Sequence, residues 1–167
     1  MKVYSITKYS DDEAIKKNDW ISVSDIGGVF NGVELTIERY KEVEDSYVNA
    51  IRMIAEYMRL ESFRVEKVNK WMDLKSKVNE YHYKELYDDN MLQLFEQIND
   101  SSVLTLDELL ILVRLQLRED IYAIPYVPYR LKIFICYDYL MTVHSSKELE
   151  GLFEEMRNSG LNPFREK

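Results

Sequence analysis

The amphipathic pattern between residues 36 and 59 constrains the fold of this chain more than any other feature. Apolar side chains recur there every three or four residues over about six turns, which is the spacing of the buried face of an α-helix. Thr36 suits the N-cap position, and Glu38 suits the positive end of the helix dipole. The predicted buried face comprises Ile37, Tyr40, Val43, Tyr47, Val48, Ile51, Ile54, Ala55 and Met58.

Two further helices are predicted in the middle of the chain. Thr105 and Glu108 form a capping box, and the segment that follows as far as Leu117 is apolar nearly all round. We therefore expect a deeply buried helix there. The apolar residues between Met91 and Ile98 also have helical spacing.

The remaining helical signals are of two kinds. Ser145 and Glu148 form another capping box, and Gly160 suits the end of the helix that would follow. The segment from Trp71 to Tyr87 interleaves charged and aromatic residues without a turn signal, so we predict it to be mainly helical. The buried stripe of the C-terminal helix is Leu149, Leu152, Phe153 and Met156.

Period-two alternation predicts the strands. Val3–Thr7 and Phe63–Val68 alternate apolar and polar residues. Ile121–Ile124 is expected to be a strand stopped by proline, with Pro125 and Pro128 suiting an edge or a connection. The residues from Leu131 to Val143 read as one long strand.

That last strand would have 13 residues, which exceeds the usual length, so we expect a bulge or bend near Asp138. Between the first strand and the long helix, Asn31-Gly32 is a strong turn signal. With 167 residues and no linker or repeat, the chain is predicted to form a single α+β domain over residues 1–167. We expect a small, mainly antiparallel sheet packed with several helices.

Charge narrows the class of partner. The chain has 30 acidic and 22 basic residues, a net charge of -8, and its basic residues are scattered. This balance favours a positively charged partner over direct contact with nucleic acid, because DNA and RNA binding needs a clustered basic face. No apolar run is long enough for a signal peptide or a membrane span, so we expect a cytoplasmic protein with no membrane contact.

Motifs for catalysis, cofactors and metals are missing from the sequence. His82 and His144 stand far apart with no ligand spacing around them, so no metal site is expected. Gly27-Gly28 lacks phosphate-loop spacing and predicts a structural turn. Cys136 lies at the end of an apolar run, which predicts a buried, inert thiol. We therefore predict a binding protein without a cofactor rather than an enzyme.

Two stretches resemble a known family. One is Trp20-Ile21-Ser22-Val23-Ser24-Asp25-Ile26-Gly27, which leads through Phe30-Asn31-Gly32 into the long helix, and the other is Tyr137-Asp138-Tyr139. Together they resemble the bacterial immunity proteins of contact-dependent growth inhibition systems. The resemblance implies a protein that neutralises the C-terminal toxin domain of its neighbour by binding it one to one. It favours a nuclease as the toxin, with an EndoU-like RNase acting on tRNA as the best guess.

The resemblance transfers no contact residues, since each such protein matches its own toxin. The negative charge suggests which residues contact the toxin, because an acidic inhibitor can occupy the basic substrate cleft of a nuclease. We expect contacts from carboxylates beside exposed rings. The outer face of the long helix supplies Glu38, Glu42 and Asp45, and the middle segment supplies Tyr81, Tyr83, Tyr87, Asp88 and Asp89.

Two other functions remain open. A small hydrolase or transferase could assemble a site from scattered Asp, Glu, His and Tyr residues, which requires His82 or His144 to meet a carboxylate. Alternatively, the protein could be a structural adaptor that self-associates through tyrosine-rich edge strands near Pro125 and Pro128.

Overall fold

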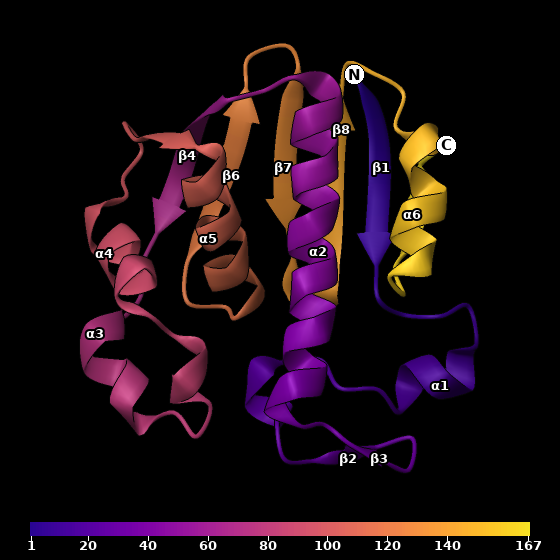
Figure 1. The fold of residues 1–167 in the computed structure, drawn as a ribbon, viewed down its shortest axis with the longest axis vertical. Coiled ribbons are helices and arrows are strands. Elements are labelled where there is room, and N and C mark those ends of the chain that lie inside the picture. Colours follow the sequence, from indigo (N-terminus) through magenta and orange to yellow (C-terminus); the bar gives the residue numbers. More distant parts are fainter.

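Seven strands form one sheet in which every neighbouring pair runs antiparallel, as the computed structural model of all 167 residues shows (Figure 1). The predicted α+β class is therefore confirmed. In spatial order the strands are β5 (Val103–Thr105), β4 (Ser62–Asn69), β6 (Tyr122–Val127), β7 (Leu131–Ile135), β8 (Leu140–Ser145), β1 (Lys2–Thr7) and β9 (Asn162–Arg165).

Two helices cover the middle of this sheet. The predicted long helix is α2 (Ile37–Met58), and α5 (Leu106–Leu117) lies beside it on the same face (Figure 1). The Thr36 hydroxyl accepts a hydrogen bond of 3.2 Å from the Arg39 N–H, as expected for an N-cap. Thr105 and Glu108 form both bonds of the predicted capping box. These caps place both helices as the sequence predicts.

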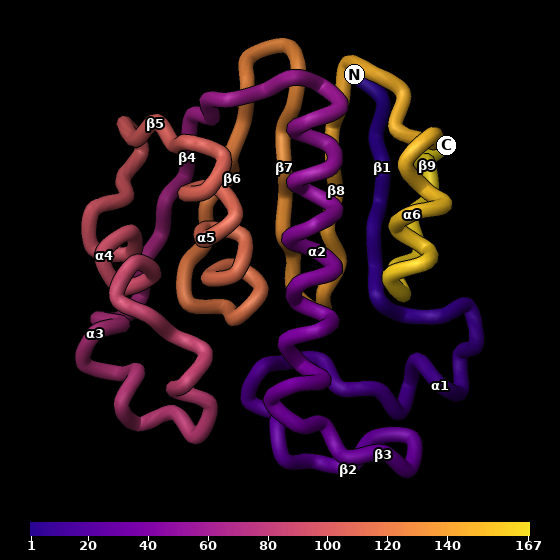
Figure 2. The backbone as a smooth tube through the Cα atoms, in the orientation of Figure 1, coloured from indigo at the N-terminus to yellow at the C-terminus, as the bar shows by residue number.

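Four shorter helices surround this pair (Figure 2). They are α1 (Glu13–Lys17), α3 (Leu74–Lys77), α4 (Asp89–Gln97) and α6 (Phe153–Asn158). Helices α3 and α4 lie on the side of β4, while α6 lies on β9. A small hairpin of β2 (Val29–Phe30) and β3 (Val33–Glu34) turns at Asn31-Gly32 and leads into α2. None of these helices combines the length and the apolar character of a membrane-spanning segment.

The prediction of one long strand from Leu131 to Val143 is wrong, although the bend predicted near Asp138 is present as a turn between two strands. The chain reverses between β7 and β8, where Asp138 and Tyr139 both have left-handed backbones with φ of 60° and 56°. The odd-numbered residues are buried in both β7 and β8. Period-two alternation therefore continues across the turn and does not distinguish one strand from two. Cys136 consequently lies exposed in the turn rather than buried in a strand, which corrects the prediction of an inert core thiol.

The proline prediction is wrong for Pro125 but correct for Pro128, which lies in the turn between β6 and β7. Strand β6 continues through Pro125 to Val127 and is an interior strand between β4 and β7. Pro125 is aligned with Val65 of β4, and the pairing of β6 with β7 begins only at the next residue, Tyr126. The sheet therefore tolerates the absence of a backbone N–H at Pro125. Its edge strands are β5 and β9 instead of β6.

Two helical predictions need correction. Residues 71–87 form only α3 and two 3₁₀ turns, Val78–Glu80 and Lys84–Leu86, because the backbone becomes extended at Tyr81. Ser145 ends strand β8, and its hydroxyl accepts a bond from the Lys147 N–H instead of capping a helix. In the predicted C-terminal stripe, Leu149, Phe153 and Met156 are buried and Leu152 is partly exposed. Gly160 follows the end of α6 with φ of +90°, as predicted.

Candidate functional site

A buried ionic network joins the two central helices. The Glu44 side chain, on α2, is fully buried. Arg118, at the end of α5, donates from Nε to Oε2 of Glu44 at 2.8 Å and from Nη2 to Oε1 at 2.6 Å. Arg114 donates from Nη1 to the same Oε1 at 2.8 Å. One buried carboxylate thus holds two guanidinium groups, which fixes α2 against α5.

The network reaches the surface through Asp45. Arg114 Nη1 lies 2.7 Å from Oδ1 of Asp45, and Lys41 Nζ lies 2.9 Å from Oδ2. Partial burial pushes the pKa of Asp45 upward, but the hydrogen bonds from Lys41 and Arg114 outweigh it and hold the pKa below its usual value. Asp45 is therefore an ionised member of the network, with both of its oxygens already bonded.

The same arginine also fixes the segment that precedes α4. Arg118 Nη1 donates to the Leu86 carbonyl at 2.8 Å, and its guanidinium lies 4.7 Å from the centre of the Tyr87 ring. The Tyr87 hydroxyl donates to Oδ2 of Asp120 at 2.6 Å. Burial raises the pKa of Asp120 to about 7, although the bond from Tyr87 and the charge of Arg118 oppose the shift.

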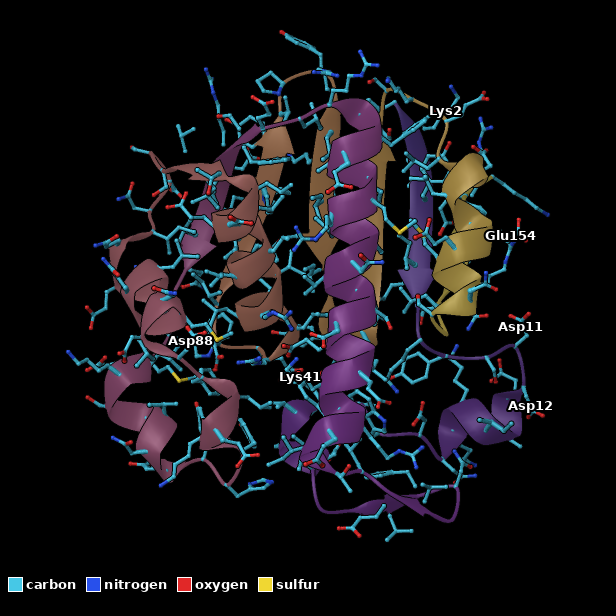
Figure 3. All side chains as sticks on the ribbon, in the orientation of Figure 1. Lys2, Asp11, Asp12, Lys41, Asp88 and Glu154 are labelled. Atoms are coloured by element: carbon cyan, nitrogen blue, oxygen red, sulfur yellow. The ribbon has the colours of Figure 1, made fainter.

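A groove of about 490 Å³ opens over this network. Its lining comes from the start of α2, from the segment that leads into α4, and from α5, and Figure 3 shows the labelled Lys41 and Asp88 on its two sides. The lining residues are Ile37, Glu38, Lys41, Glu85, Leu86, Tyr87, Asp88, Met91, Arg114 and Arg118.

The groove brings together members of both predicted contact groups. Glu38 comes from the helix group, while Tyr87 and Asp88 come from the middle segment. Asp88 also caps α4, since its Oδ1 accepts a bond of 2.9 Å from the Met91 N–H. The cap holds this carboxylate in a fixed position at the groove.

The other predicted residues lie outside the groove lining. Glu42 and Asp89 are exposed on α2 and α4. Tyr81 stacks on Tyr83 with ring centres 4.9 Å apart, and both rings lie near Tyr87. Tyr83 is only 7% exposed, so the expectation of an exposed ring is wrong at this position. Since Tyr87 lines the groove, this tyrosine cluster adjoins its wall.

Sequence reasoning missed the residues that organise the groove. Glu44 stands among the apolar residues of α2, four positions after Tyr40 and three before Tyr47, and this placement on the buried face was the available signal. A carboxylate at such a position needs a buried cation as partner. Nothing in the local sequence identified Arg118 as that cation, because the two residues are far apart along the chain.

No family model, curated protein or solved structure matches this chain. The chemistry available to the groove therefore follows from its own side chains. Three acidic residues (Glu38, Glu85, Asp88) and three basic ones (Lys41, Arg114, Arg118) line it. The basic residues are bonded to Glu44 and Asp45, as described above, so five carboxylates face three cations around it. The groove is thus suited to accept positive charge.

The histidines lie elsewhere. The ring of His82 is hydrogen-bonded at 2.8 Å to the Ile26 carbonyl, and His144 packs against Phe134 on the sheet. Neither imidazole forms an ion pair with a carboxylate. The structure also brings no three His, Cys, Asp or Glu side chains together as a potential metal site.

Proposed function

We propose that this protein is an immunity protein that binds and neutralises the C-terminal toxin domain of a contact-dependent growth inhibition system. The observation that carries the proposal is the meeting of the two predicted contact groups at one groove, whose lining includes three carboxylates that form no ion pair (Glu38, Glu85, Asp88). The net charge of -8 and the resemblance of residues 20–32 and 137–139 to the family support the same proposal. The protein would act in the cytoplasm, in a complex of one copy with one toxin domain.

The expected partner is a nuclease, with an EndoU-like RNase acting on tRNA as the first choice. A nuclease cleft carries Lys and Arg side chains that hold phosphates. Carboxylates at Glu38, Glu85 and Asp88 would take the place of those phosphates and exclude the nucleic acid. The protein itself transforms nothing in this mechanism.

Rigidity supports inhibition of this kind. The Glu44 network fixes α2 against α5, Arg118 holds the Leu86 carbonyl, and the N-cap bond orients Asp88. A preorganised surface loses little conformational entropy on binding, which favours tight complexes. The groove therefore needs no rearrangement before it can receive a cationic side chain.

The test is reconstitution with the toxin domain encoded immediately upstream. The two proteins are co-expressed, and the mixture is analysed by size-exclusion chromatography with light scattering and by an RNase assay on tRNA. We expect a complex of one copy of each and loss of nuclease activity at equimolar ratio. The absence of a complex at micromolar concentration, or full nuclease activity within a complex, would contradict the proposal.

A further inference from the structure

A second pocket lies on the other side of the α5 C-terminus, between the ends of β4, β6 and β7. It has a volume of about 310 Å³ and shares no lining residue with the groove. Its lining includes a buried amide, a carboxylate, three aromatic rings and the thiol of the one cysteine in the chain. The residues used below are Trp71, Gln116, Glu119, Tyr122, Cys136 and Tyr137.

The amide belongs to Gln116, which is only 5% exposed. Its Nε2 donates to the Ala123 carbonyl at 2.7 Å, and this bond fixes which end of the amide is oxygen. Oε1 is buried and is the one buried side-chain polar atom in the structure without a hydrogen-bond partner. Buried acceptors are normally satisfied, so this oxygen can still accept a hydrogen bond from a donor in the pocket.

The carboxylate belongs to Glu119, whose backbone is left-handed with φ of 62°. It is partly buried and forms no ion pair. Burial, and then the nearby charges of Asp138 and Asp25, raise the pKa of Glu119 above its usual value. The surroundings of this carboxylate are therefore negative, and a cation entering the pocket would be stabilised there.

Aromatic rings complete the pocket. Trp71, Tyr122 and Tyr137 are 49%, 37% and 76% exposed. Large rings on a surface lose hydration when another flat group covers them, and their faces attract cations. A guanidinium group is planar, stacks on aromatic rings and carries several N–H donors, whereas an ammonium group is compact and strongly hydrated.

We propose that this pocket binds a guanidinium group, with one N–H donated to Oε1 of Gln116, its charge beside Glu119, and its faces against the exposed rings. An arginine side chain of the cationic partner would supply it. The source of the guanidinium rests on the proposed function, whereas the chemistry of the pocket does not.

The probe is methylguanidinium, and methylurea is the matched neutral ligand of nearly the same shape. Binding is followed by Trp71 fluorescence, since Trp20 is buried, and by protection of Cys136 from alkylation. Concentrations stay below about 50 mM, far under those that denature proteins. We expect saturable binding of methylguanidinium and at least tenfold weaker binding of methylurea.

Two variants test whether methylguanidinium binds in this pocket. Glu119→Gln keeps the shape of the side chain, and we expect it to weaken methylguanidinium at least fivefold, whereas Glu154→Gln on α6 leaves binding unchanged. The proposal is overturned if methylurea binds as tightly as methylguanidinium, or if Glu119→Gln binds methylguanidinium as tightly as the wild type does. It is also overturned if neither readout gives a saturable signal.

The source of the guanidinium is tested on the complex with the toxin domain. We expect Glu119→Gln to weaken that complex at least fivefold, and Glu154→Gln to leave it unchanged. If methylguanidinium binds but Glu119→Gln leaves the complex unaltered, the assignment to an arginine of the partner is wrong. If methylguanidinium binds but no toxin complex forms, the proposed function fails while the pocket assignment stands.

Discussion

The Arg118 guanidinium holds both oxygens of the Glu44 carboxylate, at 2.8 Å from Nε and 2.6 Å from Nη2, in a fully buried site between α2 and α5. Such a bidentate pair orients its two helices more strictly than apolar packing does, because both partners must keep one geometry. Its net contribution to stability is a separate matter, since burying two charges costs free energy that their attraction must offset.

Breaking this pair should be strongly destabilising. Glu44→Ala leaves Arg118 charged and buried, with only the Leu86 carbonyl and the Met91 sulfur as remaining hydrogen-bond partners. We expect the free energy of unfolding to fall by about 3 to 5 kcal/mol, as measured by urea denaturation. The matched control is Glu42→Ala, two residues away on the exposed face, which should change it by less than about 0.5 kcal/mol.

A loss of under about 1 kcal/mol for Glu44→Ala would contradict this interpretation. Such a result would mean that Arg118 reaches water when its partner is removed. The double variant Glu44→Met with Arg118→Met provides a further check, because replacing both charges by apolar groups should cost much less than removing one of them.

Asp120 should make stability depend on pH. Burial raises its pKa from the ordinary value of 3.8 to about 7 in the folded state. Between these values the folded protein holds a proton that the unfolded chain releases, so the free energy of unfolding decreases as pH rises through this window. Relative to Asp120→Asn, which stays neutral, we expect the wild type to lose about 1 to 4 kcal/mol between about pH 4 and about pH 7.

The comparison uses urea denaturation of both proteins across this pH range. Carboxylates that do not interact with Asp120 titrate in the same way in both proteins, so their contribution cancels in the difference. Asp89→Asn, an exposed carboxylate on α4, is the control variant and should follow the wild type at every pH. A constant difference between the wild type and Asp120→Asn would show that Asp120 is already ionised at low pH.

The central helices were predictable because their signals are local. Thr36 and the Thr105 capping box mark where α2 and α5 begin, and a three-four apolar rhythm marks the buried face of α2. The β7–β8 hairpin was not predictable in this way. Its turn depends on left-handed backbones at Asp138 and Tyr139, residues that carry no glycine-like preference strong enough to interrupt an alternating pattern.

The site was predictable only in part, for a related reason. Charge on an exposed helix face suggested Glu38, turn-free aromatic sequence suggested Tyr87 and Asp88, and all three line the groove. Their meeting depends on pairings between distant residues, such as Arg118 with the Leu86 carbonyl and Tyr87 with Asp120. Tertiary packing of this kind leaves no periodic trace in the sequence.

Arg59 offers a test of backbone strain. It follows the last residue of α2 with φ of 54°, and its N–H bonds to the helix carbonyls, a position that glycine prefers. Arg59→Gly should raise the free energy of unfolding by about 0.5 to 1 kcal/mol, because glycine adopts this conformation without steric cost. Arg52→Gly, in the middle of the same helix, should instead lower it by about 1 kcal/mol. Equal losses in the two variants would contradict the expected relief of strain.

Charge reversal at the groove should slow association with the toxin domain. Glu38→Lys combined with Glu85→Lys replaces two rim carboxylates, and we expect the association rate measured by stopped flow at low salt to fall at least about tenfold. The control Glu154→Lys with Glu155→Lys makes the same change in net charge on exposed positions of α6, and should slow association by less than about threefold. Added salt should slow the wild type more than the groove variant, since it screens the attraction. Equal effects of the two double variants would show that only net charge matters and that the groove does not receive the partner.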